Sequence, residues 1–320
     1  MNEQRPARVV VVGAGHVGAT FAYALLLSGL AAEIVLVDVD RKRAEGEAMD
    51  LAHAVPFAPA TRVWAGEYGD CAGAAVTVIA AGPGQRPGET RLDLARRNAT
   101  IIGDIASRVA RENPAGIIIV ATNPVDVLTF VAARVSGLPR ERVFGSGTIL
   151  DTARFRALLA EHLGVDARSV HAFIVGEHGD SEVPVWSLAN VAGMGLSAFG
   201  ELVGAAVDEG VRDELFRRTR DAACAIIERK GATFFAVSAG LVRIVEAILR
   251  DQKTVLSVSS VIDGPYGLPD VALSLPTVIG RGGVERVLEL PLAADELEGL
   301  HRSGSVLRAV LDGLDLTSGQ

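Results

Sequence analysis

Cysteine and lysine are both scarce in this sequence. Only two of the 320 residues are cysteines, Cys71 and Cys224, and they form neither a CxxC pair nor a spacing typical of metal ligands. A disulfide framework and a cysteine-based metal site are therefore excluded, and we expect no metal and a reduced compartment, the cytoplasm. Lysine occurs three times among 31 basic residues, a bias to which the sequence attaches no function.

Long apolar runs and excess positive charge are also missing. No run approaches the length that crosses a bilayer, and the first residues, MNEQRPAR, are too polar for a secretory signal. The net charge of −8 disfavours nucleic acids and anionic membranes as partners. A hydrophobic content of 49% with 22% charged residues is typical of a globular protein, and 320 residues favour two domains or one large α/β domain.

The first half of the chain alternates between strand-like and helix-like segments. Its strand-like runs are apolar throughout rather than alternating with polar residues, which indicates strands buried on both faces of a parallel sheet. Right-handed crossovers then give a doubly wound sheet. The predicted strands lie at 8–12, 33–40, 74–82, 116–124 and 142–147. The fold class expected is α/β, with a doubly wound (Rossmann) domain over residues 1–146.

After about residue 150 the pattern changes. Helices are expected at 150–164, 205–230, 234–251 and 292–314, and extended segments at 169–186, 254–263 and 271–280. This mixture predicts an α+β domain over residues 147–320. The absence of repeats and of an obvious linker indicates that this domain packs closely on the first.

A glycine-rich turn follows the first predicted strand. Gly13, Gly15 and Gly18 form GxGxxG, and Asp38 follows Gly18 by 20 residues, at the end of the second strand. Gly13 permits a tight turn, Gly15 lets a pyrophosphate approach the backbone, and Gly18 brings helix and strand together. A carboxylate at the second strand end accepts from ribose hydroxyls and repels a 2′-phosphate, so NAD is favoured over NADP. The alternative is a glycine-rich turn with an unrelated surface aspartate.

The intervening positions of this motif are His16 and Val17. Both are included among the candidate cofactor contacts because they start the helix whose N-terminus would face the phosphates. For His16 the simpler interpretation is an ordinary residue at the start of a helix.

Two further segments, LDTAR at 150–154 and GEHGDS at 176–181, carry chemically capable side chains. Asp151 and Arg154 lie three apart and so share a helix face. His178 lies between glycines and acids. Taken alone, the histidine would more often be structural, and the Asp–Arg pair a local salt bridge worth under about 1 kcal/mol.

Taken together and in order, the motifs resemble the L-lactate/malate dehydrogenase family. They are GAGHVG with its aspartate, QRPGETR at 85–91, NPVD at 123–126, LDTAR, GEHGDS and DVALSLPTVIGRGGVE at 270–285. The likeness covers nearly the whole chain. It implies reversible hydride transfer between NADH and pyruvate giving L-lactate, the last step of fermentative glycolysis. A malate or broader 2-hydroxyacid dehydrogenase and, more remotely, a non-catalytic NAD-binding protein are the alternatives.

The resemblance also implies roles for individual residues. His178 would be the general acid, and the base in reverse, because its unperturbed pKa of about 6.5 is close to working pH. Asp151 would fix the tautomer of the imidazole and favour its charged form. Arg154 would bind the substrate carboxylate through two parallel hydrogen bonds, and Arg91 would stabilise charge on the carbonyl oxygen.

Other positions would line the cofactor and substrate. Asn123, at a strand end, would touch both the nicotinamide ribose and the substrate oxygen. Gly82 and Thr122, at neighbouring strand ends, are further candidate cofactor contacts. Thr233 would line the pocket for the substrate side chain, although an ordinary threonine ahead of a helix fits almost as well. The loop that carries Arg91 would close over the site as a lid that excludes water.

Gln85 in that loop bears on the choice of substrate. By resemblance, malate enzymes hold an arginine at this place, which pairs with the second carboxylate of oxaloacetate. Glutamine there favours pyruvate, because an uncompensated carboxylate in a closed site costs several kcal/mol. Arg86 would make the opposite choice if the loop register slipped by one residue, but the segment aligns without a gap between Gly82 and Arg91.

A regulatory site is implied by two more matches. Arg156 and His171 occupy the places where bacterial enzymes activated by fructose 1,6-bisphosphate carry an arginine and a histidine at a subunit interface. Arg156 projects about 200° around the helix from Arg154, away from the substrate. The alternative is an interface that holds two cations without any effector. A homotetramer is expected by resemblance.

Overall fold

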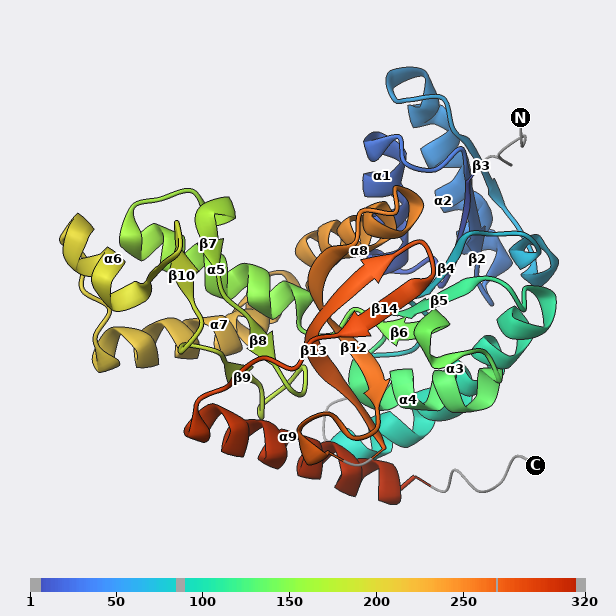
Figure 1. Ribbon diagram of the computed structural model, residues 1–320. Coiled ribbons are helices and arrows are strands. Elements are labelled where there is room, and N and C mark those ends of the chain that lie inside the picture. The colour runs from blue at the N-terminus through green and yellow to red at the C-terminus, as the bar shows by residue number, and fades with distance from the viewer. Residues whose placement is uncertain (1–6, 85–89, 269, 315–320) are drawn as a thin grey trace.

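The computed structural model describes residues 7–84, 90–268 and 270–314, which within these bounds form one mixed nine-stranded sheet flanked by helices (Figure 1). The strands of this sheet are β1 (Arg8–Val12), β2 (Glu33–Val37), β3 (Arg62–Ala65), β4 (Val76–Ile79), β5 (Ile117–Val120), β6 (Val143–Gly145), β12 (Thr254–Ile262), β13 (Val271–Gly280) and β14 (Gly283–Val287).

The first six strands form the doubly wound sheet that the sequence predicts. Their order is β3-β2-β1-β4-β5-β6 and their pairings are parallel. Side chains of β1 alternate between two cores: Val9 and Val11 face one layer of helices, and Val10 and Val12 the other. The strand order reverses between β1 and β4, the place where such sheets bind their ligands. Strand β3 was not predicted, because its four residues, RVWA, are too few and too exposed to give an apolar run.

The remaining strands of the sheet come from the second half of the chain. Strand β12 pairs antiparallel with β6, and β13 and β14 follow it as an antiparallel extension. Hydropathy marks β12 and β13 as strands but does not indicate which sheet they join. Because the two halves share a sheet, the domain division at residue 146 stays a prediction.

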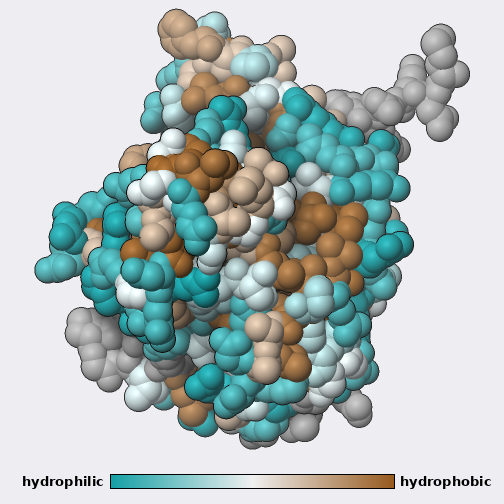
Figure 2. Space-filling model, turned by 60° about the vertical axis from the view of Figure 1, so that its left-hand side comes forward, coloured by the Kyte–Doolittle hydropathy of each residue, from teal (hydrophilic) through white to brown (hydrophobic). Residues whose placement is uncertain are grey.

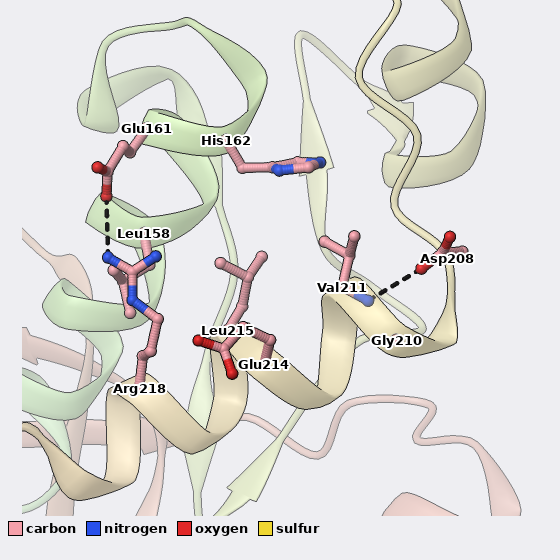
Figure 3. Close-up of a pocket in the computed structure, with 9 residues that line it drawn as sticks. All are labelled: Leu158, Glu161, His162, Asp208, Gly210, Val211, Glu214, Leu215 and Arg218. Atoms are coloured by element: carbon pink, nitrogen blue, oxygen red, sulfur yellow. Dashed lines mark hydrogen bonds and ion pairs between the residues drawn. The ribbon is translucent and has the colours of Figure 1, made fainter.

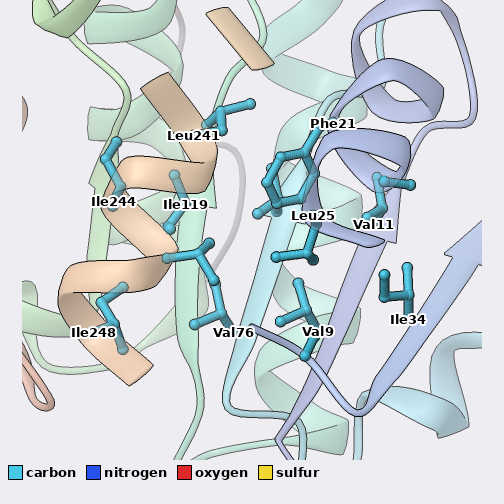
Figure 4. Packing of buried hydrophobic residues seen from close by; sticks show 14 of the residues in the cluster. Val9, Val11, Phe21, Leu25, Ile34, Val76, Ile119, Leu241, Ile244 and Ile248 are labelled. Atoms are coloured by element: carbon cyan, nitrogen blue, oxygen red, sulfur yellow. The ribbon is translucent and has the colours of Figure 1, made fainter. Parts of the chain in front are cut away.

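Helices cover both faces of the sheet. On one face α8 (Phe235–Leu249) of the second half packs beside α1 (His16–Ser28), so that Leu241, Ile244 and Ile248 share a buried cluster with Phe21 and Leu25 (Figure 4). Full burial of each such side chain contributes about 1.5–3 kcal/mol, so this cluster fastens the halves together. The helices are α1 (His16–Ser28), α2 (Arg41–Ala54), α3 (Arg91–Glu112), α4 (Val125–Ser136) and α8 (Phe235–Leu249).

The rest of the second half forms a lobe beside the sheet, drawn at the left of Figure 1, and a last helix beneath it. The segment expected to be extended, 169–186, forms short strands on either side of an irregular turn that holds His178. None of the described helices combines the length and apolar character that a membrane crossing needs. The elements are α5 (Ile149–Leu163), α6 (Leu196–Val203), α7 (Glu209–Lys230), α9 (Ala294–Asp312), β7 (Val170–His171), β8 (Ile174–Val175), β9 (Val183–Pro184), β10 (Asn190–Val191) and β11 (Met194–Gly195).

The three motif glycines have different structural reasons. Gly13 has φ +106°, a conformation that favours glycine, and a Cβ there would meet the Ala81 backbone. A Cβ on Gly18 would overlap the carbonyl oxygen of Gly13, so the close approach of α1 to the turn requires glycine. A Cβ on Gly15 would meet nothing within 4 Å, so packing within the chain does not require glycine there.

Gly18→Ala should lower the free energy of unfolding by about 1–3 kcal/mol, because the added methyl group forces the turn and helix apart. Urea denaturation followed by circular dichroism measures this change. The matched control is Gly46→Ala in the exposed part of α2, where a Cβ has open space; it should raise stability by about 0.5–1 kcal/mol. An unchanged midpoint for Gly18→Ala would contradict the packing described.

Candidate active site

The predicted cofactor residues gather at one edge of the sheet. Gly13 follows β1, Asp38 follows β2, Gly82 lies just beyond β4, and Thr122 and Asn123 lie just beyond β5. These strands are parallel neighbours, so their carboxyl ends meet at the same edge. The structure thus brings together residues that the sequence spreads over 110 positions, from 13 to 123.

The start of α1 fits a dinucleotide phosphate. The N-cap of this helix is Gly15, and no side chain caps the helix end. The first N–H groups of the helix therefore keep their donor capacity, and the helix dipole favours an anion beside them. The open space beside the Gly15 Cα leaves room for that anion, which is the fit expected of an NAD pyrophosphate.

The carboxylate of Asp38 holds the glycine turn. Its Oδ2 accepts a hydrogen bond from Ala14 N at 2.6 Å, and its Oδ1 accepts one from Asp40 N at 2.8 Å. Each carboxylate oxygen has a second lone pair, so these bonds leave acceptor capacity for ribose hydroxyls. The predicted contact to the ribose is compatible with this arrangement and stays a prediction.

The segments after β4 and β5 are tied to each other. Thr122 Oγ1 donates to the carbonyl of Ala81 at 2.6 Å. Asn98 of α3, a buried residue that sequence reasoning missed, donates through Nδ2 to the carbonyl of Asn123 at 2.9 Å and to that of Pro83 at 3.3 Å. The side chain of Asn123 is left exposed at the sheet edge, as a residue that touches ligands requires.

The candidate catalytic residues of the second half form one hydrogen-bonded group. His178 Nδ1 lies 2.5 Å from Asp151 Oδ2, and Arg154 Nη1 donates to Asp151 Oδ1 at 2.9 Å. Both oxygens of Asp151 are therefore engaged, and its side chain is only 3% exposed. The side chain of His178 is 24% exposed, so its ring can be reached from outside the chain. The sequence predicted this association, and the structure shows it.

The electrostatics of this group favour a charged imidazole. Burial opposes the charge on His178, but the Asp151 carboxylate outweighs burial and raises the pKa of His178 to about 9. Burial also opposes the ionisation of Asp151, and the neighbouring His178 and Arg154 nevertheless hold the pKa of Asp151 below its usual value. At neutral pH the pair is therefore an imidazolium held by a carboxylate.

Arg154 has capacity beyond its bond to Asp151. Its side chain is 12% exposed, and its Nη2 is buried with no hydrogen-bond partner among the described residues. A buried guanidinium nitrogen without a partner costs free energy, and a bound carboxylate would satisfy it. This is the fit expected for the carboxylate of a 2-keto acid.

Two buried acids beside His178 were missed at the level of the sequence. Asp126, 2% exposed, accepts a hydrogen bond from His178 N through Oδ2 at 2.7 Å. Glu182 is buried as well, and burial together with the charge of Asp151 raises the pKa of Glu182 to about 8. In the sequence, Asp126 is the last residue of NPVD and Glu182 directly follows GEHGDS. Neither motif indicates that the two acids lie beside the same histidine.

The loop residues can be placed only in part. Gln85 and Arg86 lie outside the described residues. Arg91 is the first residue of α3, and the preceding Thr90 caps that helix by exchanging hydrogen bonds with Asp93. The roles of Gln85 and Arg91 therefore stay predictions.

The start of α1 faces the connection between α7 and α8. The ring of His16 is exposed and stacks on that of Phe234 at 5.3 Å, and the carbonyl of Val17 accepts from Ser238 Oγ at 3.3 Å. Thr233 lies half-buried directly before Phe234. The cofactor contacts of His16 and Val17 and the pocket role of Thr233 stay predictions.

The two expected effector residues lie on adjacent elements. Arg156 of α5 donates through Nε to the carbonyl of Ala172 at 2.8 Å, and its guanidinium lies 5.1 Å from the centre of the Phe173 ring. His171, the residue before Ala172, is exposed at the end of β7. Arg156 lies on the same helix as Asp151 and Arg154, and His171 lies on β7. The effector roles of Arg156 and His171 stay predictions.

A cavity of about 500 Å³ lies between α5 and α7 (Figure 3). It holds none of the predicted catalytic or cofactor residues. Within the described parts of the chain, no group of three or more His, Cys, Asp or Glu residues is arranged to hold a metal ion. The lining residues are Leu158, Glu161, His162, Asp208, Gly210, Val211, Glu214, Leu215 and Arg218.

Comparison with known proteins agrees with this geometry. The chain is 49% identical to an L-lactate dehydrogenase of Moorella thermoacetica over 317 residues, which is 99% of this chain and 100% of the relative. It is 48% identical to an L-lactate dehydrogenase of a Thermoanaerobacter species over 309 residues, which is 97% of this chain and 99% of the relative.

Solved structures show the same similarity. The crystal structure of a lactate dehydrogenase from a deep-sea metagenome library has a TM-score of 0.92 at 42% identity, covering 97% of this chain and 99% of that one. A minor L-lactate dehydrogenase from Enterococcus mundtii, in a ligand-bound form, has a TM-score of 0.93 at 42% identity, covering 96% of this chain and 98% of that one.

Two family profiles match nearly the whole chain. Residues 7–145 match the NAD-binding domain of lactate/malate dehydrogenases, which confirms NAD as the cofactor, and residues 148–314 match their α/β C-terminal domain. With its sheet order, its His–Asp–Arg group and these matches in agreement, the chain belongs to the lactate/malate dehydrogenase family.

Proposed function

We propose that this protein is an NAD-dependent L-lactate dehydrogenase, an enzyme that interconverts pyruvate and L-lactate. The observation that carries the proposal is the buried group in which Asp151 joins His178 to Arg154. A scaffold protein that merely retained the fold would have no use for a partly exposed imidazolium beside a guanidinium with a spare buried donor. The names of the relatives and of the solved structures support the same activity.

The side chains divide the chemistry between binding and proton transfer. Arg154 Nη2 binds the carboxylate of pyruvate and so orients the keto group toward His178. Bound NADH supplies the hydride. His178 donates its proton to the oxygen that becomes the hydroxyl of lactate, and Asp151 stabilises the imidazolium before transfer and holds the ring in place afterwards. In the reverse direction the neutral imidazole takes the proton back.

Pyruvate reduction should depend on pH through His178. Its pKa is raised above 6.5 to about 9, so kcat/KM for pyruvate should be level at neutral pH and fall about tenfold per pH unit above 9. Replacing Asp151 by Asn removes the charge that raises this pKa and should move the fall to lower pH. Initial rates between pH 6 and 10.5 measure both curves, and a variant with the same alkaline limb as the parent would contradict the role of Asp151.

The same shift links pH to stability. Because the folded-state pKa of His178 lies above its unfolded value, the charge on His178 contributes its full stabilisation at pH 6.5 and at lower pH for as long as Asp151 stays ionised. That contribution is lost as the pH rises from 6.5 through about 9.

Selection of pyruvate over oxaloacetate is proposed to rest on Gln85. Leaving the second carboxylate of oxaloacetate unpaired costs several kcal/mol, which corresponds to roughly a thousandfold preference for pyruvate. A malate or broader 2-hydroxyacid dehydrogenase is the second candidate, because the matched family includes malate enzymes.

Substrate comparison tests this selection. The parent protein should oxidise NADH with pyruvate far faster than with oxaloacetate, and Gln85→Arg should raise the oxaloacetate rate relative to the pyruvate rate. An unchanged ratio would mean that Gln85 does not face the substrate. An oxaloacetate preference in the parent protein would instead assign that position to Arg86.

Assembly into a homotetramer is part of the proposal. Exposed apolar side chains support contacts between copies: Tyr23 and Leu27 on α1, Met49 on α2 and Phe57 beyond it are each about half or more exposed. Figure 2 shows hydrophobic patches among hydrophilic side chains on one face of the molecule. Apolar patches of this kind mark interaction sites. Cytoplasmic location and a place in fermentative glycolysis stay predictions.

Activation by fructose 1,6-bisphosphate is proposed to act through Arg156 and His171. An exposed imidazole beside an arginine on the adjacent helix suits a phosphate group. The effector should increase NADH oxidation with limiting pyruvate, and His171→Gln should remove this increase. Arg168→Gln is the control: it alters an exposed arginine three positions from His171 and should leave the stimulation intact. If the effector does not stimulate the parent protein, Arg156 and His171 are cations of an interface that binds no effector.

A further inference from the structure

Asp126 makes a contact that the proposed chemistry does not explain. It is the second residue of α4, its side chain is buried, and its Oδ2 accepts from His178 N at 2.7 Å. The two residues are 52 positions apart, one on α4 and the other in the turn between β8 and β9. Burying a carboxyl group is costly unless its bonds repay the loss of water, so this contact requires a reason.

Helix capping does not supply that reason. An acid in the first turn of a helix usually stabilises its own helix, but the N-cap of α4 is Pro124, with no side-chain cap bond. The carboxylate of Asp126 reaches across to the turn at 176–182 instead. Asp126 also lies three positions after Asn123, the residue expected to touch nicotinamide and substrate. One short segment therefore carries both the cofactor-side contact and the anchor of the acid/base histidine.

The charges around the pair are arranged to interact. His178 faces the acids Asp151, Asp126 and Glu182, and the first two favour its protonated form. Asp126 itself faces His178 and Glu177 and the hydroxyl of Ser259. Burial raises the pKa of Asp126 to about 6, although the His178 contacts and Ser259 favour its charged form. At neutral pH Asp126 is therefore mostly charged.

We propose that Asp126 is a positioning residue for proton transfer: its carboxylate fixes the backbone of His178 relative to the Asn123 segment and adds a second negative charge that keeps the imidazole protonated. The inference deepens the proposed function and rests on it. Asp151 holds the ring at Nδ1, and Asp126 holds the main chain of the same residue, so the histidine is fixed at two points. The two charges act on the same proton.

Three variants separate position from charge. Asp126→Asn keeps an oxygen that can accept from His178 N and removes only the charge. Asp126→Glu keeps the charge and should restore much of the effect. Glu296→Gln is the matched control, because Glu296 is also a buried acid that accepts backbone hydrogen bonds, from Ser187 and Ala293. The acids that raise the pKa of His178 are Asp151, Asp126 and Glu182 instead.

The primary measurement is the titration of His178 in the protein without substrate, followed by NMR of histidine labelled with ¹⁵N. The His178 signal is identified because it is missing from the spectrum of His178→Asn. This titration does not depend on turnover. In Asp126→Asn the midpoint should fall by about one pH unit from its parent value, as expected when one nearby opposite charge is lost. In Asp126→Glu the His178 midpoint should lie closer to that of the parent, and in Glu296→Gln it should equal that of the parent.

The second measurement is the pH profile of kcat/KM for pyruvate. The alkaline limb of Asp126→Asn should move to lower pH by the same amount as the NMR midpoint. Below about pH 6 Asp126 is protonated in the parent protein as well, so the charge effect should vanish there. A merely structural role would lower the rate equally at every pH.

The outcomes separate the two proposals. A parent protein without pyruvate reduction overturns the proposed function, whatever the titrations show. An active parent with an unchanged His178 midpoint in Asp126→Asn overturns the inference and leaves the function intact. If Asp126→Asn does not fold, the test passes to Asp126→Ser, which also removes the charge. A His178 midpoint and an alkaline limb unchanged from those of the parent in that variant would overturn the charge role.

Discussion

The hydrogen bond between Asp151 and His178 is the interaction on which the active-site arrangement depends. It joins α5 to the irregular turn between β8 and β9, and it is buried on the aspartate side and open on the histidine side. A buried carboxylate without a cationic partner would be strongly destabilising, so the histidine and Arg154 together make the buried charge tolerable. The same arrangement supplies an imidazolium at neutral pH, which is the form that pyruvate reduction consumes.

Two sets of contacts join the two halves of the chain and so hold the partners of this bond in place. Strand β12 extends the parallel sheet beyond β6, and α8 packs into the core beside α1. These contacts hold the turn with His178 beside the sheet edge where the cofactor residues gather. Asp126 then connects the two sides directly. A dehydrogenase needs the His178 turn and the cofactor edge in a fixed relative position, because hydride and proton reach adjacent atoms of one substrate from different parts of the protein.

Glycine and burial explain why the cofactor edge forms where it does. Gly13 and Gly18 are required by the chain itself, because a side chain at either would strike backbone atoms. A Cβ on Gly15 would meet no atom of the chain, so the small size of this residue leaves space for a bound pyrophosphate. Asp38 spends part of its acceptor capacity on the turn, which pre-organises the site before a nucleotide arrives.

The sequence by itself determined the doubly wound sheet, the glycine turn and the joint presence of His178, Asp151 and Arg154, because these depend on local periodicity and on ordered motifs. Only the tertiary structure decided that β12–β14 extend the first sheet, since antiparallel pairing partners leave no mark in hydropathy. It alone also showed Asp126, Glu182 and Asn98 at the site. Each is a single polar residue whose role depends on burial or on a contact with a residue more than 20 positions away. The sequence around such a residue indicates neither its burial nor its partner.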